Sequence, residues 1–82
     1  MITIFYAGEP VNRSKNLAGI LRYLRIVPAK RIVLERREGE SGILRILFNN
    51  GAYTEADFAS YIVMKDWVSS RRSLKGVEVK EY

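Results

Sequence analysis

Arginine and lysine side chains are the groups in this sequence best suited to binding chemistry, and they are unevenly spread. The formal net charge is +5, but residues 11–37 carry eight basic residues and one acidic residue, a local net of +7. Such a concentration of cations indicates a surface for nucleic acid or another polyanion, the alternative being an ordinary solvated basic face. The candidate nucleic-acid-binding residues are Arg13, Lys15, Arg22, Arg25, Lys30 and Arg31.

A second candidate surface lies on a helix predicted from about residue 54 to residue 73. A broad core-facing stripe is expected from Phe58, Tyr61, Ile62, Met64 and Val68. On the far side, Ala59, Val63 and Trp67 form a second apolar strip, which one layer of helices in a small domain would leave uncovered. We therefore predict a homodimer or partner interface anchored by Trp67. The alternative is that Trp67 packs within its own molecule.

Residues for catalysis are scarce. The chain contains no histidine and no cysteine, which excludes catalytic triads, thiol nucleophiles and zinc sites built from those residues. Glu38 and Glu40 fall in a predicted turn, and Asp57 and Asp66 would face nearly opposite sides of one helix, so no magnesium or calcium site is expected. No phosphate-binding glycine motif occurs. We predict a protein without enzymatic activity, metal, cofactor or small-molecule substrate.

The first half of the chain must position the basic residues. Residues 2–6 predict a strand, followed by a break at residues 8–10. A helix is then expected before Pro28, because apolar residues recur at three- and four-residue spacing. Residues 30–37 and 43–49 predict an antiparallel pair of strands joined by a short polar connection. The helix would bury Leu17, Ile20, Leu21 and Leu24, and the second strand of the pair would present Leu44, Ile46 and Phe48 on one face.

The second half of the chain predicts one helix and one strand. Thr54 followed by Glu55 and Asp57 resembles a helix start, since a threonine can cap the first turn and carboxylates favour its positive end. The helix would run to about Ser73, with Gly76 as the stop signal. Residues 77–82 alternate strictly between apolar and polar, which predicts a final strand.

The element order β-α-β-β-α-β predicts a single α+β domain over residues 1–82. We expect a ferredoxin-like split βαβ arrangement, with two helices on one face of a four-stranded antiparallel sheet. The competing arrangement is a β-α-β-β-α core with an unpaired tail. RNA-recognition modules share this order and stack bases on aromatic side chains of the sheet. Residues 42–49 lack a pair of alternate aromatics, and Phe5 and Tyr6 are neighbours on opposite faces, so sheet-face binding gains no support.

Two functions are compatible with these patterns. The first is a small, non-catalytic accessory protein that binds DNA or RNA through the basic helix and nearby strand ends. The alternative is a protein-interaction or inhibitor module that forms a homodimer or binds a partner through the last helix. The small size and the charge suit a protein of a phage or another mobile element. A chain without cysteine or a long apolar run is expected to be cytoplasmic and not membrane-bound.

Overall fold

The computed structural model describes all 82 residues and contains six strands and two helices. The helices are α1 (Ala18–Leu24) and α2 (Tyr61–Ser69), and short 3-10 turns cover Glu38–Glu40 and Arg72–Leu74. The strands are β1 (Ile2–Tyr6), β2 (Glu9–Ser14), β3 (Ala29–Arg36), β4 (Gly42–Phe48), β5 (Tyr53–Phe58) and β6 (Glu78–Glu81).

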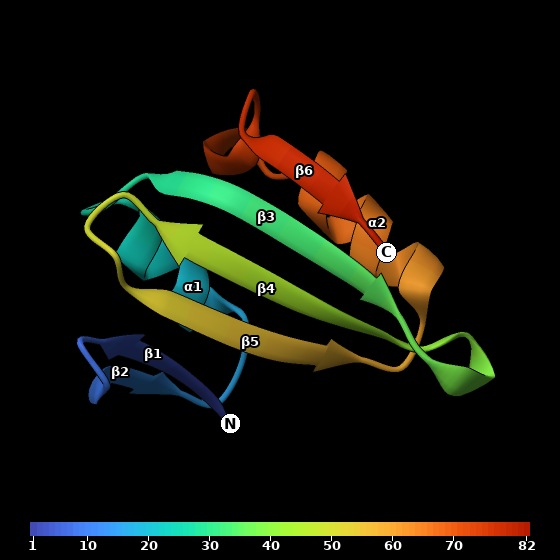
Figure 1. Cartoon of the computed structure of the whole chain (residues 1–82), viewed down its shortest axis with the longest axis horizontal. Coiled ribbons are helices and arrows are strands. Elements are labelled where there is room, and N and C mark those ends of the chain that lie inside the picture. Colours follow the sequence, from blue (N-terminus) through green and yellow to red (C-terminus); the bar gives the residue numbers. More distant parts are fainter.

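All six strands belong to one mixed sheet with the order β2-β1-β5-β4-β3-β6. The strands β3, β4 and β5 form a central antiparallel meander. On one side β1 pairs antiparallel with both β5 and β2, and on the other side β6 runs parallel to β3. Both helices lie behind the sheet in Figure 1, so they cover one face, here called the helix side, and leave the other as the open face.

The core fills the space between the sheet and the helices. Burial alternates along β4, where Leu44, Ile46 and Phe48 are fully buried and the residues between them are partly exposed. This is the period of two expected for a strand with one covered face, and the predicted placement of these three residues on one face is confirmed. The helices contribute the buried residues Ile20, Leu24, Tyr61, Met64 and Val68.

The predicted ferredoxin-like arrangement is wrong, because the sheet has six strands rather than four and is not wholly antiparallel. The first additional strand is β2, which occupies residues predicted as a break and a helix entrance. Ala7 and Gly8 both adopt positive φ angles, of 53° and 83°, and so form the tight turn that folds β2 back onto β1. Pro10 is tolerated because β2 lies at the edge of the sheet.

The second additional strand is β5, which occupies the predicted start of the last helix. Thr54 is buried, and its hydroxyl donates a 2.7 Å hydrogen bond to the carbonyl oxygen of Thr3 in β1 instead of capping a helix. The N-cap lies six residues later than predicted, at Ser60, which accepts a hydrogen bond from the Val63 amide, and the helix begins at Tyr61. It ends at Ser69, before the predicted end near Ser73.

Candidate nucleic-acid interface

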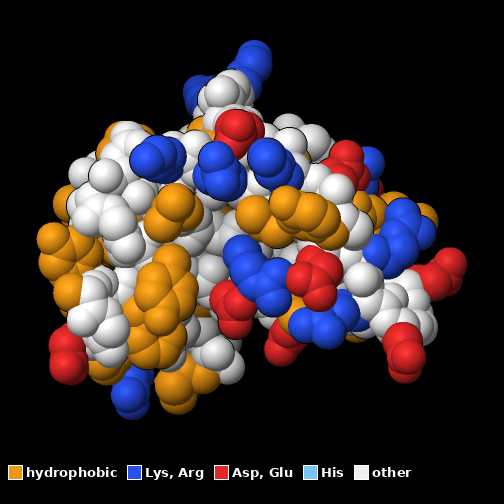
Figure 2. Space-filling view, viewed as in Figure 1, with side chains coloured by type: hydrophobic (Ala, Val, Ile, Leu, Met, Phe, Trp, Pro, Cys, Tyr) orange, Lys and Arg blue, Asp and Glu red, His pale blue; other side chains and the backbone are white.

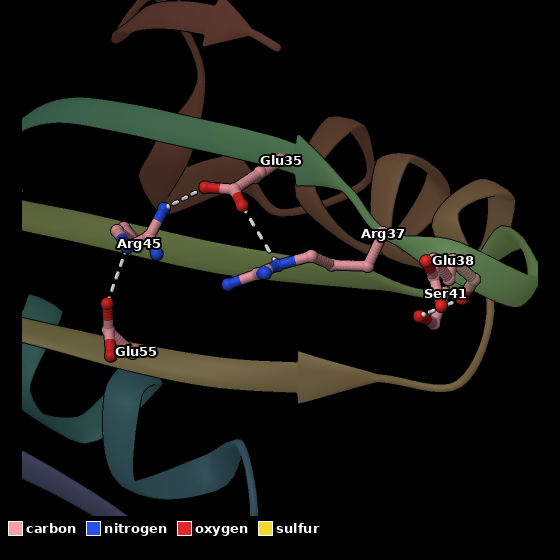
Figure 3. Close-up of polar contacts among 6 residues, drawn as sticks. All are labelled: Glu35, Arg37, Glu38, Ser41, Arg45 and Glu55. Carbon is pink, nitrogen blue, oxygen red and sulfur yellow. Dashed lines mark hydrogen bonds and ion pairs between the residues drawn. The ribbon is translucent and has the colours of Figure 1, made fainter.

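The open face carries many charged side chains, but they largely neutralise one another. Arg45 lies at its centre and forms ion pairs with Glu35 on β3 and Glu55 on β5 (Figure 3). Glu35 also pairs with Arg37 at 2.9 Å. Figure 2 shows acidic and basic side chains side by side on this face. The hydrogen bond from Arg45 is the main cause that lowers the pKa of Glu35 below its ordinary value.

Two of the six predicted phosphate-binding residues belong to this face and lie far apart on it. Arg13 is exposed on β2, whereas Arg31 is on β3, with three strands between them in the sheet order. Arg31 also forms a 2.6 Å ion pair with Glu78 on β6, so its charge is partly balanced. The two arginines therefore do not form a common anion site.

Two predicted lysines lie at the ends of elements. Lys15 is in the connection from β2 to α1 and lines a hollow that also contains Glu55 and Asp57. Lys30 is exposed at the bulge near the start of β3. Neither lysine forms an ion pair within the molecule, and the two lie at different places around the sheet.

The remaining predicted residues, Arg22 and Arg25, are exposed on α1 and its C-terminal end. Arg25 lines a groove of about 540 Å³ between α1 and the connection that follows α2. Arg71 and Arg72 line the same groove from the opposite wall, and Leu21, Leu24 and Ser73 complete it. We call this the basic groove. No acidic side chain lines it, and none of its three arginines forms an ion pair.

Arg71 is held in place by its neighbour Trp67. Its Nε atom donates a 3.2 Å hydrogen bond to the Trp67 carbonyl oxygen, and its guanidinium carbon lies 5.3 Å from the centre of the Trp67 ring. A cation over an aromatic face is attracted by the ring quadrupole. The remaining guanidinium N–H groups have no partner in the protein, so they are available to a ligand.

The distribution of ion pairs concentrates free positive charge outside the centre of the open face. Four of the fourteen basic residues form ion pairs, and their partners are four of the nine acidic residues. Ten cations and five anions therefore remain unpaired. The basic groove is the one hollow that is lined by three of those free cations without a carboxylate.

Two of the groove residues, Arg71 and Arg72, were not among the residues predicted to bind nucleic acid. Both lie after the end of α2 at Ser69, and Arg71 also donates a hydrogen bond to the Trp67 carbonyl oxygen in the last turn of that helix. The signal that could have found them is the presence of three basic residues within five positions.

The predicted interface residues do not form one helical strip. Ala59 precedes the N-cap Ser60, Val63 is 57% exposed, and Trp67 is half-buried with its ring centre 6.2 Å from that of Phe58. Ile62, expected in the core, is 70% exposed. A hollow of about 500 Å³, here called the Trp67 hollow, is lined by Val63, Asp66, Trp67, Ser69, Ser70 and Arg71.

The open face does carry one pair of stacked aromatics, which was not predicted from the sequence. The rings of Phe5 on β1 and Tyr53 on β5 lie 5.4 Å apart with an interplanar angle of 21°. An apolar patch over these strands is visible in Figure 2. The pair forms between strands whose pairing was not predicted, so no spacing within a single strand could reveal it.

The structure contains no group of three or more acidic residues placed to hold a metal ion. No helix combines the length and the apolar character needed to cross a bilayer. Comparisons with protein-family models, with curated proteins and with solved structures find no match to this chain.

Proposed function

We propose that the protein is a non-catalytic binding protein that holds the phosphate backbone of nucleic acid in the basic groove. The observation that carries this proposal is the convergence of Arg25, Arg71 and Arg72 on one hollow without a carboxylate. Two separate elements supply these arginines, so their convergence depends on the tertiary structure and is not a property of one solvated helix.

Arginine suits this role better than lysine. The planar guanidinium group donates two parallel hydrogen bonds to a phosphate and is more weakly hydrated than an ammonium group. The apolar floor of the groove, formed by Leu21 and Leu24, lowers the local dielectric and strengthens each charge–charge contact. Contacts of this kind position a nucleic acid without reading its sequence.

The test is binding of a fluorescently labelled oligonucleotide to charge-reversed variants. The double variant Arg25→Glu, Arg72→Glu places two carboxylates in the groove, and we expect its affinity to fall at least thirtyfold, since a lost charged contact costs on the order of 1–3 kcal/mol. The matched control is Arg13→Glu, Lys80→Glu, which makes the same change in net charge at two exposed positions outside the groove. Equal losses in both variants would reduce the proposal to non-specific attraction by net charge.

A second candidate function is a protein-interaction or inhibitor module that uses the exposed side of α2. The adjacent residues Ile62 and Val63 are 70% and 57% exposed, which favours a protein contact at this position. Sedimentation equilibrium of the wild type and of Val63→Glu tests self-association. A wild-type dimer that Val63→Glu converts to a folded monomer would support this candidate, and a monomeric wild type without a protein partner would contradict it.

A further inference from the structure

The Trp67 hollow adjoins the basic groove. Arg71 lines both, and its guanidinium carbon lies 5.3 Å from the centre of the Trp67 ring. A polymeric ligand whose backbone occupies the basic groove can therefore place one of the groups attached to that backbone in this hollow. In nucleic acid, the groups attached to the backbone are the bases.

The hollow has a planar wall and an apolar wall. Trp67 and Arg71 supply planar groups that lie close together, and Val63 supplies an exposed aliphatic side chain. Unpaired bases stack on aromatic rings and on arginine guanidinium planes, whereas bases inside a duplex are already covered by their neighbours. The hollow thus favours a single strand over a duplex.

One exposed polar side chain in the hollow, Asp66, has no partner within the protein and is open to a ligand. The hydroxyls of Ser69 and Ser70 donate to carbonyl oxygens within α2, while the Asp66 carboxylate forms no ion pair and no side-chain hydrogen bond. An ionised carboxylate only accepts hydrogen bonds, and beside a phosphate site it repels any ligand that offers it no donors.

Among the bases, guanine matches this requirement best. Its Watson–Crick edge presents two adjacent donors, the ring N–H and the exocyclic amino group, which fit the two oxygens of one carboxylate. Cytosine and adenine present one amino group beside an acceptor nitrogen, and thymine and uracil place their single N–H between two carbonyl oxygens. A carboxylate therefore discriminates in favour of guanine.

We propose that the Trp67 hollow binds one unpaired guanine of a single-stranded nucleic acid, stacked on Trp67 and Arg71 and hydrogen-bonded by Asp66. This inference rests on the proposed function, because the basic groove must hold the neighbouring phosphates. It goes beyond that function by naming the strandedness and the preferred base.

The chain contains a single tryptophan and five tyrosines, so emission excited at wavelengths that tyrosine does not absorb reports on Trp67 alone. The probes are a short oligothymidylate, the same oligomer with one central guanine, the matching duplex, and inorganic polyphosphate as a polyanion without bases. We expect quenching of Trp67 by both single strands, with roughly tenfold tighter binding of the guanine-containing strand. Polyphosphate should compete for the groove without quenching.

The variants separate this inference from the proposed function. Asp66→Asn keeps the shape of the side chain and should abolish the preference for guanine, whereas the matched control Asp57→Asn, on β5, should retain it. Because Trp67 also packs against Phe58, Val63→Glu serves as the second hollow variant and should weaken oligonucleotide binding more than polyphosphate binding.

Three results would overturn the inference. Arginine-dependent binding without quenching, or without a preference for guanine, would remove it and leave the proposed function intact. Emission that changes with protein concentration in the absence of any ligand would show that a second copy of the chain occupies the hollow. Failure of every probe to bind would remove the proposed function together with the inference.

Discussion

The hydroxyl of Tyr61 donates a 2.7 Å hydrogen bond to Oε1 of Glu81, and Lys65 Nζ lies 3.0 Å from the same oxygen. These contacts join α2 to β6, the strand that runs parallel to β3 at the edge of the sheet. The hydrogen bonds from Tyr61 and then Lys65 lower the pKa of Glu81 below its ordinary value of 4.5. The ionised carboxylate is therefore the form that holds β6 against the helix.

The stability of the protein should depend on this carboxylate in acid. Because the pKa of Glu81 is lower in the folded chain than in the unfolded chain, its stabilising effect is complete above pH 4.5 and is lost as the pH falls through the lower folded value. Urea unfolding over this range should show a weaker pH dependence for Glu81→Gln than for the wild type. Glu9→Gln, at an exposed position without an ion pair, is the control. An unchanged pH dependence in Glu81→Gln would assign the effect to other carboxylates, such as Glu35.

The two faces of β4 should differ sharply in their sensitivity to truncation. Ile46 is 1% exposed on the helix side, whereas Ile43 is partly exposed on the open face. Ile46→Ala should lower the free energy of unfolding by about 2–5 kcal/mol, because it removes buried methyl groups and leaves a cavity. Ile43→Ala, the identical substitution on the same strand, should cost roughly 1 kcal/mol. If denaturant unfolding shows equal losses of unfolding free energy for Ile46→Ala and Ile43→Ala, the open face must be covered as well.

Gly19 is expected to tolerate no side chain in spite of its place in a helix. A Cβ atom there would lie 1.9 Å from Ser14 Oγ and 2.4 Å from Ser14 Cβ. Gly19→Ala should therefore destabilise the protein by about 1–3 kcal/mol through overpacking, although alanine gains about 1 kcal/mol in helix propensity. Thermal unfolding of the double variant Gly19→Ala, Ser14→Gly should recover most of the loss, and a double variant as unstable as the single one would contradict the steric explanation.

The salt dependence of the binding affinity should reflect the number of phosphates that the basic groove contacts. Three arginines that each contact one phosphate of a single strand predict a slope of roughly −2 for the logarithm of the affinity against the logarithm of the salt concentration. Arg72→Ala should make this slope shallower by roughly 0.7. An affinity that does not change with salt would contradict binding through phosphates.

The elements with strong local patterns could be predicted from the sequence. The strands near residues 30–37 and 43–49 and the apolar face of α1 agree with the structure within a few residues, because Ile and Leu at regular spacing specify which side is buried. The two missed strands have weaker local signals. The segment Glu9–Ser14 contains a proline and an asparagine, and its pairing depends on the turn at Ala7 and Gly8.

The error at β5 shows how pairing overrides local preference. Thr54 has the chemistry of a helix cap, but Thr54 and Ala56 alternate with exposed residues and complete the sheet between β4 and β1. This strand takes over residues at the start of the predicted helix, so α2 begins later, at Tyr61. At its other end α2 stops at Ser69, and Arg71 and Arg72 in the connection that follows line one groove with Arg25 of a distant segment. No pattern within one segment could have predicted this groove.

The two outer strands, β2 and β6, also determine whether the sheet can pair edge to edge with the sheet of another molecule. β2 carries Pro10, which cannot donate a backbone hydrogen bond, and β6 has only four residues, all exposed, with charged side chains at three of them. Short, charged or proline-bearing edges are poor templates for further strand pairing. Growth of the sheet from molecule to molecule, the route to fibrils, is therefore blocked at both ends.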